Sequence, residues 1–89
     1  MRIKKGFELR HLLNEHIIVA YGKENIDFNK VISLNDSAAY LWDNIIDKDF
    51  DAEMLASLLL QEYEVDSETA LRDAKAVLES WVSAGLTEQ

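Results

Sequence analysis

Residues 30–42 read KVISLNDSAAYLW, a short apolar segment that leads directly into a helical one. Val31–Leu34 has the β-branched, roughly alternating character of a strand. Asn35 and Asp36 then supply the side-chain oxygens that favour a helix start. The segment therefore predicts a strand at Lys30–Leu34 followed at once by a helix. A strand at a sheet edge offers backbone hydrogen bonds to another chain, so this segment is the first candidate for function.

Two segments before this strand have strand patterns of their own. Phe7–Leu12 alternates apolar and polar residues after Gly6, and His16–Tyr21 is β-branched and mostly apolar. Leu13–Glu15 is expected to form the turn between them, and Gly22–Asn29 a loop before the third strand. The first third of the chain is therefore predicted to form a three-stranded antiparallel meander.

The remainder of the chain has apolar residues at helical spacing in three segments. The first is predicted over Asp36–Ile46. Asp51 is the expected N-cap of the second helix, and Asp66 or Ser67 that of the third. The order of elements, strands first and then three helices, predicts an α+β domain with a winged-helix-like arrangement.

The end of the third helix has a recognisable stop signal. Gly85 suits the left-handed conformation that follows many helices. Leu86 is then expected to fold back on Trp81, one turn earlier. All 89 residues are thus expected to form one domain, 1–89, with a single modest core.

The composition argues against most kinds of catalytic site. Cysteine is absent, which excludes disulfides, thiolate catalysis and cysteine-ligated metals in this chain. No GxSxG, GxGxxG, P-loop or EF-hand spacing occurs. His11 and His16 are the only histidines and are interpreted as ordinary strand residues, because no metal-ligand spacing accompanies them. We therefore expect no enzymatic activity, no cofactor and no metal.

A carrier-protein role is one alternative, because Ser37 follows Asp36 at a helix start in a small acidic chain. Acyl and peptidyl carrier proteins carry their prosthetic group on the serine of an Asp-Ser-Leu motif. Here Ala38 stands in place of the leucine, and strands precede the motif where a carrier protein has a helix. We interpret these residues as helix-capping residues.

Charge is distributed unevenly along the chain, whose net charge is −8. Residues 1–34 hold six basic and four acidic residues, whereas residues 35–89 hold three basic and thirteen acidic ones. Such an acidic helical half repels phosphate, so nucleic-acid binding is not expected. No apolar run approaches the ~20 residues that a membrane span needs, and no signal-peptide pattern is present. A cytoplasmic protein that does not contact a membrane is expected.

The remaining candidate site is the lip between the third strand and the third helix. An extended peptide can add to the free edge of Lys30–Leu34 while its side chains enter a groove along that helix. The alternative is an interaction or regulatory module that presents its acidic face to a basic protein. An open edge strand can also pair with its own copy, which would give a homodimer.

Several segments, taken in order, resemble the PqqD family, the precursor-peptide recognition elements of ribosomally made and modified peptides. The segments are GFELR at 6–10, VISLN at 31–35 followed by DSA at 36–38, LW at 41–42, LLQEYEVD at 59–66 and WVSAGL at 81–86. The resemblance covers nearly the whole chain. The segment Gly22–Asn29 is longer than the corresponding turn of the founding pyrroloquinoline-quinone members, which favours a PqqD-like subgroup serving another peptide.

The resemblance implies a non-catalytic peptide chaperone with a winged-helix-like fold. Its ligand would be the leader of a precursor peptide, added as a strand and presented to a modifying enzyme, often a radical SAM protein. The implied backbone partners are Lys30, Val31, Ile32, Ser33 and Leu34. The implied groove side chains are Leu71, Arg72, Ala74, Lys75, Leu78 and Trp81 of the third helix.

Overall fold

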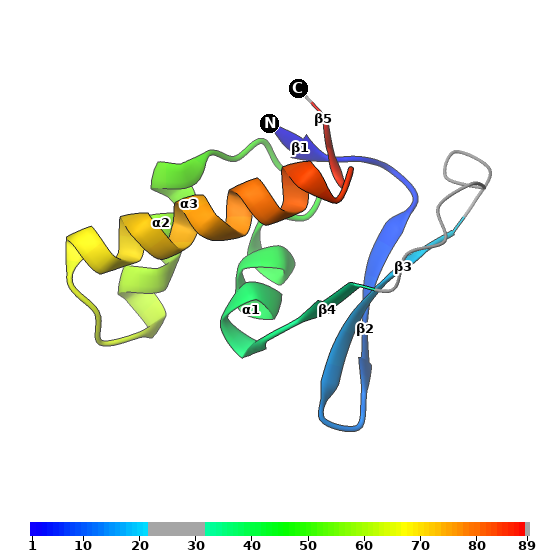
Figure 1. Ribbon diagram of the computed structural model, residues 1–89, viewed down its shortest axis with the longest axis horizontal. Coiled ribbons are helices and arrows are strands. Elements are labelled where there is room, and N and C mark those ends of the chain that lie inside the picture. Colours follow the sequence, from blue (N-terminus) through cyan, green and yellow to red (C-terminus); the bar gives the residue numbers. More distant parts are fainter. Residues whose placement is uncertain (22–31, 89) are drawn as a thin grey trace.

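Strands and helices are arranged side by side, with a β-hairpin projecting from one end of a three-helix body (Figure 1). The computed structural model describes residues 1–21 and 32–88. The elements are β1 (Arg2–Ile3), β2 (Phe7–Leu12), β3 (Glu15–Ala20), β4 (Ile32–Leu34), α1 (Asp36–Ile45), α2 (Ala52–Glu62), α3 (Ser67–Ser83) and β5 (Thr87–Glu88). The predicted α+β class, with three antiparallel strands followed by three helices, is confirmed.

The main sheet has the order β2-β3-β4 and is antiparallel throughout. β2 and β3 are joined by a two-residue turn, since Leu12 pairs with Glu15. β4 lies at the edge, as predicted for this strand. Lys30, Val31 and the predicted loop Gly22–Asn29 lie outside the described residues.

The helix starts follow from local capping chemistry. Asn35, Asp51 and Asp66 are the N-caps, and each side chain accepts a hydrogen bond from the backbone N–H three residues later, at 2.7–2.8 Å. Each bond satisfies one of the N–H groups that a first helical turn leaves unpaired. The predicted starts of all three helices are confirmed.

The end of α3 is a Schellman motif. Gly85 has a φ of 81°, and its N–H donates to the Val82 carbonyl at 3.0 Å. The Leu86 N–H donates to the Trp81 carbonyl, also at 3.0 Å, and the Leu86 side chain is completely buried. The predicted fold-back of Leu86 on Trp81 is confirmed, and it turns the chain toward β5.

The two ends of the chain meet in a second small sheet that the sequence analysis did not predict. β1 pairs with β5, so that Ile3 lies opposite Thr87, and the Lys4 N–H donates to the Leu86 carbonyl at 2.9 Å. The Phe50 N–H donates to the carbonyl of Met1 at 2.7 Å. Figure 1 shows both termini close together beside the end of α3. Two-residue strands carry too little pattern to be predicted.

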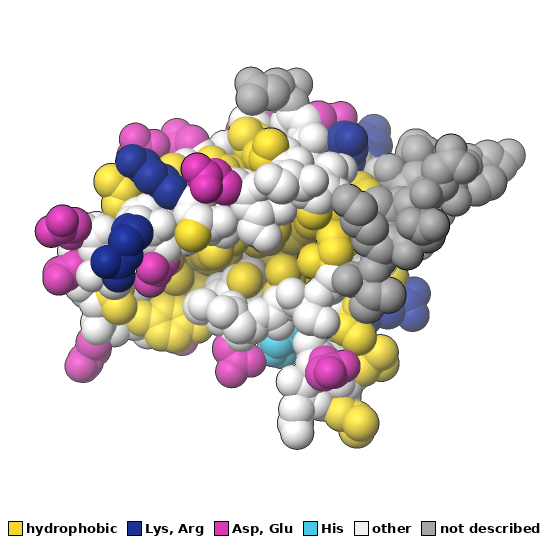
Figure 2. Space-filling view, viewed as in Figure 1, with side chains coloured by type: hydrophobic (Ala, Val, Ile, Leu, Met, Phe, Trp, Pro, Cys, Tyr) yellow, Lys and Arg dark blue, Asp and Glu magenta, His cyan; other side chains and the backbone are white. Residues whose placement is uncertain are grey.

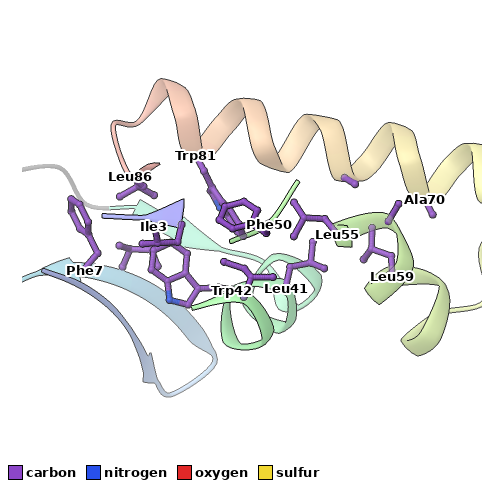
Figure 3. Packing of buried hydrophobic residues seen from close by; sticks show 14 residues of the cluster. Ile3, Phe7, Leu41, Trp42, Phe50, Leu55, Leu59, Ala70, Trp81 and Leu86 are labelled. Atoms are coloured by element: carbon purple, nitrogen blue, oxygen red, sulfur yellow. The ribbon is translucent and has the colours of Figure 1, made fainter. Parts of the chain in front are cut away.

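The core lies between the sheet and the three helices (Figure 3). Trp42 of α1 and Trp81 of α3 are each 1% exposed and meet edge to face, with ring centroids 5.4 Å apart. Phe50 packs on Trp81 in the same manner at 5.9 Å. These rings join α1, α3 and the connection before α2, and so fix α3 relative to the strand that precedes α1.

Candidate functional site

The hydrogen bonds of β3 show which backbone groups of β4 point away from the sheet. Just beyond β3, the Tyr21 N–H donates to the Gly6 carbonyl at 2.6 Å, which directs every second residue of β3 toward β2. The alternate residues of β3, His16 and Ile18, therefore direct their backbone N–H and carbonyl groups to β4, where they pair with Leu34 and Ile32.

It follows that Ser33 directs its N–H and carbonyl away from β3. Ser33 lies opposite Ile17, at the position in the ladder where the two strands do not exchange hydrogen bonds. Among the described residues no strand lies on the outer side of β4. This edge can accept a further extended strand.

A hollow lies between this edge and α3. Its volume is about 260 Å³, and its walls come from β4, the start of α1 and the C-terminal half of α3. The lining residues are Ser33, Leu34, Asn35, Ala38, Ala76, Val77, Ser80 and Trp81. Figure 2 shows this face, where hydrophobic side chains form the floor of a depression across the middle of the molecule. We call this space the strand-side hollow.

A second hollow continues on the other side of Val77, which lines both. It has a volume of about 280 Å³ and lies between the start of α1, the end of α2 and the middle of α3. Its lining residues are Ser37, Leu41, Leu59, Tyr63, Val65, Asp73 and Val77. We call it the helix-side hollow. We call the two hollows, which share Val77, the groove; β4 borders only the strand-side hollow, and the lining residues are mostly apolar.

The model of the family described as coenzyme PQQ synthesis protein D (PqqD) matches residues 15–86. The chain belongs to the PqqD family. No curated protein matches the sequence.

Two solved structures share the PqqD-family fold over nearly the whole chain. One is TbiB1 in complex with the TbiA(beta) leader peptide, with a TM-score of 0.77 and 19% identity over 99% of this chain and 95% of that one. The other is lasso peptide synthetase B1 complexed with the leader peptide, with a TM-score of 0.72 and 24% identity over 99% and 96% of the two chains. At these identities the likeness establishes the fold.

The helix residues that the PqqD resemblance implied for the groove lie in different environments in the structure. Trp81 lines the strand-side hollow, whereas Ala74 is completely buried in the core. Leu71 and Leu78 are partly buried against the core and line neither hollow. The charged residues Arg72 and Lys75 are exposed and also lie outside the lining.

The groove face of α3 is therefore displaced around the helix axis from the face that the sequence analysis favoured. Asp73, Ala76, Val77 and Ser80 line it, and none of them was among the predicted site residues. The only available signal was Val77, which continues a secondary apolar stripe through Ala70 and Ala84 at helical spacing. Leu71, Ala74 and Leu78 pack against the core instead, because the main apolar face of a helix is the face that the fold buries.

The two histidines meet at the hairpin. His11 Nδ1 and His16 Nδ1 are 2.6 Å apart, and His16 Nε2 lies 2.7 Å from an Asp36 carboxylate oxygen at the start of α1. His11 Nε2 lies 3.9 Å from the Asp43 carboxylate. This chain of contacts ties β2 and β3 to α1 beside the groove. Within residues 1–21 and 32–88, no group of three His, Asp or Glu side chains could hold a metal ion.

A larger hollow, of about 540 Å³, lies away from the β4 edge. It is lined by residues 3–9, by Tyr21, by the C-terminal half of α1 and by Ile46 and Asp47, which follow α1. Neither β4 nor α3 contributes to it, so we place the candidate site at the groove. In the part of the chain that the structure describes, no helix has the length and apolar character to cross a membrane.

Proposed function

We propose that this protein binds the leader segment of a ribosomally made precursor peptide as an additional strand on β4. The observation that carries the proposal is the outward-directed backbone of Ser33 beside a groove with a mostly apolar lining. Backbone hydrogen bonds to the edge would supply affinity, and side chains of the peptide would enter the hollows and supply specificity.

Membership of the PqqD family supports this function, and so do the two structural neighbours, which were solved with leader peptides bound. The fold supports it independently. Trp81 and Trp42 anchor α3 against α1, so the helix and the strand keep a fixed distance and form a preorganised groove. Preorganisation offsets part of the entropy that a flexible peptide loses when it binds.

We further propose that the domain is non-catalytic and hands its peptide to a separate modifying enzyme, of the radical SAM class. The backbone contact is assigned to Ser33, because Ile32 and Leu34 direct their backbone groups to β3; Lys30 and Val31, also expected as backbone partners, lie outside the described residues. The side-chain contacts are assigned to Trp81 and to the lining residues Ala76, Val77 and Ser80.

A titration followed by nuclear magnetic resonance tests the proposal. Isotope-labelled protein is titrated with the leader of the precursor peptide encoded beside its gene. We expect shifts at β4, the start of α1 and the groove face of α3. As a control, an unrelated extended peptide of the same length and charge should leave these resonances unchanged. Shifts confined to other surfaces, or no response to the leader, would contradict the proposal.

A further inference from the structure

Among the residues that line the two hollows of the groove, the formal charge is negative only. Asp73 is the charged residue of the helix-side hollow, and the strand-side hollow has no charged lining residue. No lysine or arginine of the described chain lines either hollow. A peptide that lies in the groove therefore meets a carboxylate beside an otherwise apolar surface.

Asp73 retains the capacity to bind a cation. Asp73 forms an ion pair with the neighbouring Arg72, whose Nε lies 3.8 Å from an Asp73 carboxylate oxygen. The two side chains are 75% and 55% exposed, and ion pairs as exposed as this contribute little free energy. A ligand cation that lies against the apolar wall would be partly shielded from water and would compete well for this carboxylate.

A second carboxylate, that of Asp36, lies next in sequence to two residues that line the groove. Asp36 begins α1 between Asn35, which lines the strand-side hollow, and Ser37, which lines the helix-side hollow. Its side chain is 93% exposed. An oxygen of its carboxylate lies 2.7 Å from His16 Nε2. Asp36 thus follows a residue of one hollow and precedes a residue of the other but lines neither, and both carboxylates belong to the part of the chain that has three basic and thirteen acidic residues.

Building on the proposed function, we propose that the leader segment held in the groove is cationic: it carries Lys or Arg beside its apolar anchor residues, and Asp73 selects this charge. An acidic leader would place like charges against Asp73 and would be disfavoured. The fold therefore determines the shape of the bound segment, and Asp73 contributes to the choice among segments of that shape.

Selection from a displayed random-peptide library tests the inference without knowledge of the natural leader. Peptides that bind the full chain are sequenced, and one that shifts the resonances of β4 and α3 is synthesised. We expect an excess of Lys and Arg near the apolar anchor. Replacing those residues by Gln should weaken binding to the wild type about two- to five-fold, the range for a partly exposed ion pair.

Two isosteric variants of α3 complete the experiment. Asp73→Asn should bind the cationic peptide about two- to five-fold more weakly than the wild type and should no longer distinguish it from the Gln-substituted peptide. Glu79→Gln removes the same charge from an exposed position of α3 that lines neither hollow, and should change neither affinity.

The outcomes separate the two proposals. Binders at β4 without an excess of Lys or Arg, or equal loss of affinity in Asp73→Asn and Glu79→Gln, would overturn the charge selection and leave strand addition standing. A library that yields no peptide binding at β4 and α3 would overturn strand addition and the charge selection with it.

Discussion

At the scale of single residues, Gly85 and Leu13 both have a positive φ, but at different energetic cost. Gly85 adopts a φ of 81° at the end of α3, where a glycine carries no steric penalty. Leu13 adopts a φ of 56° in the two-residue turn between β2 and β3, and its side chain is completely exposed. A leucine in this conformation costs about 1–2 kcal/mol, and no burial of its side chain offsets that cost.

Replacing Leu13 should therefore stabilise the fold. Leu13→Gly is expected to raise the free energy of unfolding by about 0.5–1 kcal/mol, because relief of the backbone strain exceeds the added entropy of glycine in the unfolded chain. Urea denaturation monitored by tryptophan fluorescence measures it. The neighbouring turn variant Asn14→Gly, at a position without positive φ, should not stabilise. A loss of stability in Leu13→Gly would show that the leucine side chain makes a stabilising contact.

At the scale of elements, β4 and α3 both line the groove. In each element, one residue can be substituted to test the role of that element. In β4, Ser33 directs its backbone outward, whereas Ile32 and Leu34 direct theirs to β3. In α3, Asp66 caps the N-terminus. Its carboxylate accepts a hydrogen bond from the Thr69 backbone N–H, and this bond lowers the pKa of the Asp66 carboxyl.

A proline at position 33 should abolish peptide binding while the domain stays folded. Ser33→Pro removes the outward N–H, and edge strands tolerate proline because that N–H is not part of the sheet. Ser33→Ala keeps the N–H and should bind the leader normally. Ile32→Pro instead removes a bond to β3 and should destabilise the domain. Isothermal calorimetry with circular dichroism checks both properties; undiminished binding by folded Ser33→Pro would rule out strand addition at this residue.

The pH dependence of stability should change when Asp66 is made neutral. Because the pKa of Asp66 is lower in the folded state, its ionised form stabilises the fold above about pH 3.9, the usual unfolded value. This contribution is lost as the pH falls through the lowered pKa. Asn caps helices as well as Asp but does not titrate. Asp66→Asn should therefore lose less of its Tm than the wild type between about pH 5 and pH 2; equal losses would contradict the assignment.

At the scale of the whole molecule, charge and shape suggest two different modes of recognition. The half of the chain from residue 35 onward has thirteen acidic and three basic residues, which would suit a basic protein docked on the outer surface. The β4 edge and its groove suit an extended peptide instead. The groove is the more specific feature, because exposed acidic residues also serve solubility alone.

Salt dependence distinguishes the two modes. Strand addition depends on backbone hydrogen bonds and apolar burial, so raising the salt from about 0.05 to 0.5 M should weaken leader binding less than about tenfold. Docking through many exposed charge pairs should weaken far more over the same range. Fluorescence anisotropy of a labelled leader at several salt concentrations measures this; a steep loss of affinity would favour the acidic-surface alternative.

The sequence alone determined the features that depend on neighbouring residues. The N-caps Asn35, Asp51 and Asp66 mark the helix starts, because a capping bond spans only three residues. The stop at Gly85 follows from the same local chemistry. The edge position of β4 followed from the order of the strands together with the family pattern.

Only the tertiary structure decided which face of α3 lines the groove and how the chain ends meet. Ala74 lies on the predicted face but is buried, whereas Val77 and Asp73 line the groove, because the positions of α1 and α2 determine the rotation of α3. The pairing of β1 with β5 likewise joins residues 84 and 86 positions apart along the chain. Such long-range contacts depend on the packing of the whole core, and no pattern of nearby residues encodes them.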